Sequence, residues 1–140
     1  MTDYLVDNSV WARAIAGDAG IVARLRRIER APSDLFVTCP AQVLEFCHSA
    51  RSPEEHDRHR AQMSLGFPLE RAPDESLVLD MQGALWDSGL VRAAGAVDIL
   101  IAGYAIVNHA KVLAADHDFD HIATVSDLQH EYVPPSVDSL

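Results

Sequence analysis

Basic residues are scarce in this sequence. The chain of 140 residues carries 11 lysines and arginines against 21 aspartates and glutamates, a formal net charge of −10 at pH 7. A protein that binds nucleic acid usually carries a basic surface, and the chain as a whole does not have this composition. The bases that are present cluster, with Arg24, Arg26, Arg27 and Arg30 in one short segment. This cluster predicts either a solvated helix face or a contact surface for nucleic acid or an acidic partner.

Cysteines and long hydrophobic runs are scarce too. Cys39 and Cys47 are too few for a disulfide framework, so a reducing cytoplasm is the simplest compartment. The longest apolar stretch, from Ile99 to Val107, is far too short to span a bilayer, and no membrane partner is expected. The composition, 49% hydrophobic and 23% charged, is that of a globular protein, and we expect one domain over residues 1–140.

Short apolar segments alternate with segments of helical periodicity along the chain. Strands are predicted at 4–6, 35–39, 67–70, 111–115 and 130–133. Helices are predicted at 9–16, 18–30, 40–50, from 52 onward, and at 74–91, 98–110 and 119–123. This alternation predicts βαβ units and therefore an α/β fold, with a parallel sheet covered by helices on both faces. Ligands of such sheets bind beyond the carboxyl ends of the strands, where the strand order reverses.

Four acidic residues lie in or directly after apolar segments: Asp7, Glu45, Asp98 and Asp116. Carboxylates are almost never fully buried without a partner, and an isolated one takes up a proton or binds a cation. Asp7 and Asp116 each follow a predicted strand, whereas Glu45 and Asp98 lie in early helical turns that follow loops. All four can therefore converge on one end of the sheet, and this pattern predicts a shared cation.

Carboxylate oxygens favour Mg²⁺ or Mn²⁺, whereas zinc would require cysteine or histidine ligands at a regular spacing. An ion held in this way completes its coordination with water and phosphate oxygens, so hydrolysis of a phosphodiester is the natural reaction. Ser9 is expected either to cap the helix that follows or to bond to a phosphate oxygen or a metal-bound water. Asp118 is expected either to cap a short helix or to reach the metal through water.

Other interpretations of the acidic residues fit less well. Segment 116–121, Asp-His-Asp-Phe-Asp-His, begins like an EF-hand loop but lacks glycine at the sixth position and glutamate at the twelfth. An aspartyl phosphatase requires a second aspartate where Ser9 stands. A receiver-type site requires a lysine at the end of a late strand, whereas Lys111 begins one.

The ordered set of motifs resembles a known family. Leu5-Val6-Asp7-Asn8-Ser9 is similar to the opening of PIN-domain ribonucleases, and Glu45 lies on the helix after the second strand, as in that family. Segment 97–102, Val-Asp-Ile-Leu-Ile-Ala, is similar to the third acidic motif, and segment 112–123 to the last one. Size and coverage resemble the VapC toxins of VapBC toxin–antitoxin pairs. Ala114 and Ala115 depart from the pattern, since many members have threonine before the last aspartate.

The resemblance implies a three-layer α/β/α sandwich with a parallel sheet of about five strands. It implies an Mg²⁺-dependent endoribonuclease, with Mn²⁺ as the alternative ion, that is the toxin of a type II toxin–antitoxin system. Such a toxin cleaves RNA, is usually a homodimer and is inhibited by a cognate VapB antitoxin. The alternatives are a PIN-like metal-dependent nuclease of RNA processing and a non-catalytic PIN-like binding module.

Residue by residue, the resemblance makes Asp7, Glu45, Asp98 and Asp116 the catalytic acids. Asp7, Asp98 and Asp116 would be the metal ligands, and Ser9 and Asp118 would be auxiliary.

The two tryptophans are not part of these motifs. Trp11 and Trp86 are expected to be core or interface residues, and stacking on RNA bases is the less favoured alternative.

The net charge and the acid cluster lead to a first prediction. We expect a cognate antitoxin to bring basic residues to the acidic groove, where an arginine displaces the metal ion. Replacing the basic residues of the tail of a co-purified antitoxin should therefore restore RNA cleavage by the complex, measured with the same RNA for each variant. Inhibition that is unchanged by these replacements would contradict the hypothesis.

Overall fold

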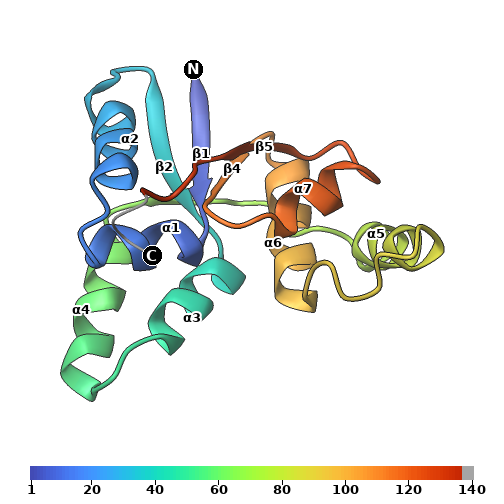
Figure 1. Cartoon of the computed structure of the whole chain (residues 1–140), viewed down its shortest axis with the longest axis horizontal. Coiled ribbons are helices and arrows are strands. Elements are labelled where there is room, and N and C mark those ends of the chain that lie inside the picture. The colour runs from blue at the N-terminus through green and yellow to red at the C-terminus, as the bar shows by residue number, and fades with distance from the viewer. Residues whose placement is uncertain (137–140) are drawn as a thin grey trace.

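A parallel sheet forms the centre of the molecule, which is described for residues 1–136 in a computed structural model (Figure 1). The sheet has five strands in the order β3-β2-β1-β4-β5, and every neighbouring pair is parallel. The strands are β1 (Thr2–Val6), β2 (Asp34–Thr38), β3 (Phe67–Pro68), β4 (Lys111–Ala114) and β5 (Gln129–Tyr132). The helices are α1 (Asn8–Ile15), α2 (Ala19–Arg30), α3 (Pro40–His48), α4 (Pro53–Met63), α5 (Glu75–Asp87), α6 (Ala96–Val107) and α7 (Asp118–Ala123). The predicted α/β sandwich with five parallel strands is confirmed.

Helices cover both faces of the sheet because the central strands are apolar on both sides. Successive side chains of a strand point to opposite faces. Leu5 of β1 packs in one core with residues of α5, α6 and α7, among them Met81, Ile101 and Phe119. Its neighbours Tyr4 and Val6 pack in the other core with residues of α1 and α2, among them Val10, Ile21 and Ile28. None of the helices within residues 1–136 has the length and apolar character needed to cross a membrane.

The strand order reverses next to β1, and this reversal positions the site. From β1 the chain proceeds to β2 and β3 on one side of the sheet, and it returns to β4 and β5 on the other side. In open α/β sheets, ligands bind at the carboxyl ends of the strands beside such a reversal. Asp7 directly follows β1, and Asp116 follows β4 by two residues, so both lie at that edge.

Polar residues and a glycine fix several helix ends, and two of these ends differ from the prediction. Asp18 and Ser52 cap α2 and α4 and mark the predicted starts of these helices. Ser9 does not cap α1, because Asp7 holds the capping position and accepts the N–H of Ser9 at 3.1 Å. Helix α5 ends at Asp87 rather than near residue 91. Gly89 adopts a φ of 74° there, and the Leu90 N–H closes onto the Leu85 carbonyl at 2.8 Å, a pairing that ends helices.

Arg24 is not available as part of a basic surface. Its guanidinium donates two hydrogen bonds to Glu131, at 2.6 and 2.9 Å, and a third to the Tyr4 hydroxyl at 3.0 Å. These bonds tie α2 to β5 and β1. Arg26, Arg27 and Arg30 are exposed, so only this smaller part of the cluster fits the predicted solvated helix face.

Two helical glycines test the packing of α5 against α6. A Cβ on Gly103 of α6 would lie 2.9 Å from a Val78 methyl and 3.0 Å from Pro73, whereas a Cβ on Gly83 of α5 would meet nothing within 4 Å. Gly103→Ala should therefore destabilise the protein by roughly 1–3 kcal/mol through overpacking. Gly83→Ala should stabilise it by about 0.5–1 kcal/mol because alanine is the better helix former.

The free energy of unfolding, measured by chemical denaturation, checks this pair. Opposite signs for the two substitutions are expected. Equal effects would contradict the close approach of α5 and α6.

Candidate metal centre

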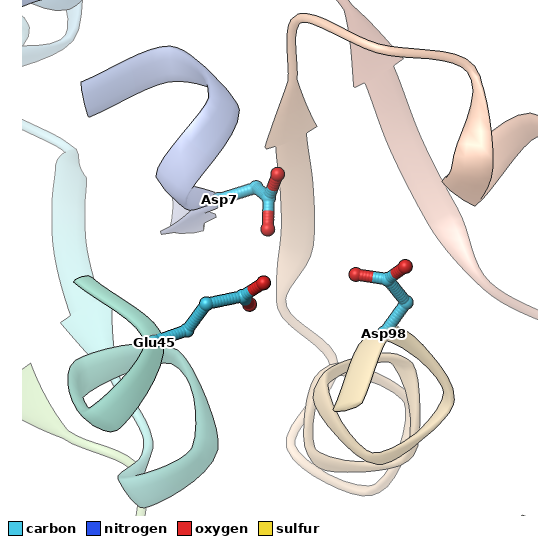
Figure 2. Close-up of side chains that lie close together, drawn as sticks. All are labelled: Asp7, Glu45 and Asp98. Atoms are coloured by element: carbon cyan, nitrogen blue, oxygen red, sulfur yellow. The ribbon is translucent and has the colours of Figure 1, made fainter. Parts of the chain in front are cut away.

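Three carboxylates from distant parts of the chain face one space at the carboxyl edge of the sheet. Figure 2 shows Asp7 at the junction of β1 and α1, Glu45 on α3 and Asp98 on α6, with their carboxylates turned toward one another. One oxygen of each lies within 4.8 Å of the others. The tertiary structure thus brings together three of the four acids that the sequence singled out.

Asp7 is the most deeply buried of the three, with 4% of its surface exposed. Its Oδ2 accepts the Ser9 N–H, and its Oδ1 has no hydrogen-bond partner within residues 1–136. Burial raises the pKa of Asp7, while hydrogen bonds from Ser9 oppose this shift. The same carboxylate therefore starts helix α1 and leaves one buried oxygen open toward Glu45 and Asp98.

Ser9 fixes the position of Asp7 relative to β4. Its hydroxyl oxygen accepts the N–H of Ala115 at 2.9 Å, directly after β4. This bond ties the first turn of α1 to the chain that leads to Asp116. Ser9 thus contacts Asp7 and β4 at once, and this connection was not apparent from the sequence.

Asp98 is placed by the first turn of α6. Its Oδ2 accepts the N–H of Gly95 at 3.2 Å, which closes the start of the helix and orients the carboxylate. Burial raises the pKa of Asp98 to about 7, and the negative charge of Asp7 adds to the shift. This carboxyl group therefore keeps its proton to a higher pH than an ordinary aspartate as long as no cation balances its charge.

Glu45 is the third member of this group. Its Oε2 is buried and has no hydrogen-bond partner within the described part of the chain. Burial raises its pKa, and so do the charges of Asp7, Asp116 and Asp118. An oxygen in this position has lost its water and gained no donor, which is the condition that a bound cation relieves.

Asp116 and Asp118 lie at the rim of the site. Asp116 is not among the carboxylates whose oxygens lie within 4.8 Å of one another, but its charge raises the pKa of Glu45. Its Oδ1 accepts the N–H of Asp118 at 3.2 Å. Burial raises the pKa of Asp116 as well. Direct binding of a metal by Asp116 therefore stays a prediction.

Arg13 is a residue of the site that the sequence interpretation missed. Its positive charge lowers the pKa of Asp116, against the effects of burial and of Asp7 and Asp118. Arg13 follows Ser9 by four residues on α1, so both lie on one helix face. That spacing was the available signal. The positive charge of Arg13 partly offsets the negative charge of Asp116 at the rim of the site.

The donor set fits a hard divalent cation. It consists of carboxylate oxygens of Asp7, Glu45 and Asp98. Within residues 1–136, Asp7 and Glu45 each have one buried oxygen without a hydrogen-bond partner. Burial raises the pKa of all three carboxyl groups, and the charge of a neighbouring carboxylate adds to each shift: Asp118 for Asp7, and Asp7 for Glu45 and Asp98. Mg²⁺ and Mn²⁺ prefer such oxygen ligands, and an ion bound there would reverse the cost of burying the charges.

Comparison with known proteins places this geometry in a family. The family model for the PIN domain matches residues 4–125. The chain belongs to the PIN-domain family. Ribonuclease VapC21 of Mycobacterium tuberculosis is 31% identical over 135 residues, which cover 94% of each protein. The resemblance of the sequence motifs to PIN domains is thereby confirmed.

Solved structures share the PIN fold of this chain. VapBC-1 from nontypeable Haemophilus influenzae aligns with a TM-score of 0.69 at 21% identity, covering 94% of this chain and 98% of that one. VapBC2 from Rickettsia felis, in a crystal with a DNA fragment from its promoter, aligns with a TM-score of 0.68 at 14% identity over the same shares. At such low identity these likenesses establish the fold.

The raised pKa of Asp98 makes metal binding depend on pH. Below its pKa of about 7 the carboxyl group holds a proton that a cation must displace. The affinity for Mg²⁺ should therefore increase from pH 6 to pH 8, and binding at pH 6 should release protons. Titration calorimetry in buffers of different ionisation enthalpy measures both. Asp98→Asn should release fewer protons on binding the ion, and an affinity independent of pH would contradict the assignment.

The raised pKa of Asp98 also makes the stability of the metal-free protein depend on pH. In the unfolded state Asp98 loses its proton near 3.8, the ordinary pKa of an aspartate, whereas in the folded metal-free state its pKa is raised to about 7. Since the folded state binds more protons in this range, the Asp98 contribution to the free energy of unfolding falls as the pH rises through it. Added Mg²⁺ should restore stability at neutral pH, measured as the melting temperature with and without the ion.

Proposed function

We propose that this PIN-domain protein is a metal-dependent endoribonuclease that hydrolyses phosphodiester bonds of RNA and is the toxin of a type II toxin–antitoxin pair. The convergence of Asp7, Glu45 and Asp98 on one space carries the proposal. The likeness to Ribonuclease VapC21 over 94% of both chains supports RNA as the substrate. The presence of VapBC proteins among the structural relatives supports a VapB-type antitoxin as the partner.

The ion in this proposal is Mg²⁺, with Mn²⁺ as the alternative. Asp7, through its free Oδ1, together with Asp98 and Glu45 would hold it, and Asp116 would complete the site from the rim. When bound, the ion would polarise a phosphoryl oxygen of the substrate and lower the pKa of the attacking water. Asp118 would orient a water at the edge of the site. Ser9 keeps Asp7 in place through its bonds to both Asp7 and Ala115.

An apolar hollow next to the site supports a peptide partner. It has a volume of about 250 Å³ and is lined by Trp11, Phe36, Gln42 and Met63, among others. The indole Nε1 of Trp11 and the Oε1 of Gln42 are buried without a partner within residues 1–136. A side chain of the antitoxin with apolar surface and a polar end would satisfy both. The acidic cluster nearby would attract a basic residue of the same segment.

A second apolar surface supports a homodimer. Leu44 of α3 is 70% exposed, and it lies with Val97 and Leu100 of α6 around a hollow that also includes Glu45. Large apolar side chains gathered in this way mark protein interfaces. In this proposal a second copy of the chain covers Leu44, Val97 and Leu100. The two acidic sites would then lie close to the dimer interface.

Substitution of the metal-binding acids tests the function. Asp7→Asn and Asp98→Asn should each lower the rate of RNA cleavage by at least roughly a hundredfold and abolish growth inhibition, because the site loses a charged ligand. Asp127→Asn removes an exposed carboxylate elsewhere and should leave cleavage unchanged. Circular dichroism checks that each variant is folded. Full activity in either site variant, or of the wild-type protein in EDTA, would refute the proposal.

A further inference from the structure

A hollow of about 400 Å³ opens beside the metal centre, between the end of α5, the loop that follows it and the start of α6. Its lining includes Leu85, Trp86, Val91, Arg92, Gly95 and Ile99. It is distinct from the apolar surface assigned to the homodimer. An α-helix turns by about 100° per residue, so Val97 and Ile99 leave α6 on opposite sides of Asp98. The hollow lies on the Ile99 side of α6, whereas Val97 and Leu100 line the other hollow.

Trp86 is the unusual member of this lining. Its surface is 59% exposed, so of the two expected roles, core or interface residue, the core role does not apply to it. Trp11, by contrast, packs against Phe36 and Phe46. Trp86 lies in the last turn of α5, whose end is fixed by the turn at Gly89. Trp86 therefore stands on a helix whose end is fixed, and α5 lies on the far side of α6 from the central strands (Figure 1).

Arg92 brings a positive charge to the same hollow. It is an exposed residue of the loop between α5 and α6, in a chain whose net charge is −10. An indole face beside a guanidinium is the combination that holds a nucleotide, because the base stacks and the phosphate pairs with the cation. An apolar protein partner would use the indole but would leave the charge of Arg92 without a complement.

Gly95 joins the hollow to the metal centre. Its N–H donates to the Asp98 carboxylate, and the same residue lines the hollow. Gly95 has no side chain, and a Cβ at this position would meet only the Asp98 Oδ2, at 3.8 Å. Gly95 thus contacts both the Asp98 carboxylate and the hollow. An RNA strand whose scissile phosphate lies at the metal centre would have a neighbouring nucleotide within reach of the hollow.

We propose that this hollow binds an unpaired nucleotide of the RNA substrate, with its base stacked on Trp86 and a phosphate paired with Arg92. The inference rests on the proposed ribonuclease function and adds a substrate-binding site to it. It also assigns a role to an exposed tryptophan that neither the core nor the metal centre explains. Trp86 and Arg92 would act in binding, and the acids alone in hydrolysis.

Binding measurements test the hollow directly. Short homopolymeric RNA oligonucleotides of the four bases are added to the dimeric or monomeric wild-type protein as it is purified, with Ca²⁺ in place of Mg²⁺ to slow hydrolysis. At least one of them should protect the Trp86 fluorescence from quenching by acrylamide. Trp86→Ala should weaken binding of that oligonucleotide by at least about fivefold, the lower range for loss of one stacked base. Trp86→Phe, which keeps an aromatic face, should retain most of the affinity.

Arg92→Gln provides an independent readout. Loss of one phosphate contact should reduce the slope of log affinity against log salt by roughly 0.7, the value per phosphate for a single strand. Arg58→Gln is the matched control, because Arg58 is an exposed arginine of α4 outside the hollow. It should leave the slope unchanged. An equal change in both variants would indicate a general charge effect and would overturn the role of Arg92.

Cleavage kinetics separate binding from chemistry. In Mg²⁺, Trp86→Ala should raise KM and leave kcat near the wild-type value. Leu79→Ala is the control, since Leu79 is 52% exposed on the same helix and does not line the hollow. Equal effects of the two substitutions, or dissociation of a dimer by Trp86→Ala with unchanged RNA affinity, would overturn the proposal.

Failure of the hollow and failure of the ribonuclease function are distinguishable. If the wild-type protein cleaves RNA and Trp86→Ala binds and cleaves like the wild type, the hollow is refuted and the ribonuclease function stands. If the wild-type protein cleaves no RNA but an oligonucleotide protects Trp86 and binds more weakly to Trp86→Ala, the hollow stands and the nuclease function is refuted. If no oligonucleotide protects Trp86, the hollow is refuted in either case.

Discussion

The burial of three carboxylates beside one another is the constraint on which the site depends. Oxygens of Asp7, Glu45 and Asp98 lie within 4.8 Å of one another; burial raises the pKa of each, and the charge of a neighbouring carboxylate adds to it. A protein gains no stability from such an arrangement by itself, since each carboxylate loses hydration. The arrangement persists because the surrounding elements hold it. A divalent cation, as proposed for this site, would turn this cost into binding free energy.

The parallel sheet supplies that rigidity. Asp7 extends β1, the central strand, and the strand order reverses between β1 and β4. The same carboxylate caps α1, and the Ser9 hydroxyl ties that helix to the end of β4. Asp98 is fixed in a similar way by the Gly95 N–H at the start of α6. Each of these two carboxylates thus stands at the start of a helix, so the hydrogen bonds that define the helix ends also orient the site.

Different sides of α6 face different surfaces of the protein. Asp98 faces the carboxylates, Val97 and Leu100 face an apolar surface shared with α3, and Ile99 faces the hollow with Trp86 and Arg92. One helix end therefore adjoins the proposed metal site, the proposed dimer surface and the proposed nucleotide site. This arrangement would explain how a protein with a net charge of −10 can act on RNA, which is itself negatively charged. The cation and a few placed bases, rather than a basic surface, would provide the attraction.

The sequence by itself determined the α/β class, the strands and helices within a few residues, and the acids of the site. It could do so because apolar periodicity, caps and strand-end carboxylates are local signals. It did not reveal that Asp7 rather than Ser9 caps α1, that Arg24 is committed to Glu131, or that Arg13 acts on Asp116. Nor could it show that Glu45, and not Asp116, joins Asp7 and Asp98 in a group of carboxylates within 4.8 Å of one another, or that Trp86 is exposed and lines the same hollow as Arg92. Only the tertiary structure decided these points, because they depend on distances between segments far apart in the chain, which the packing of helices on the sheet sets and no local pattern encodes.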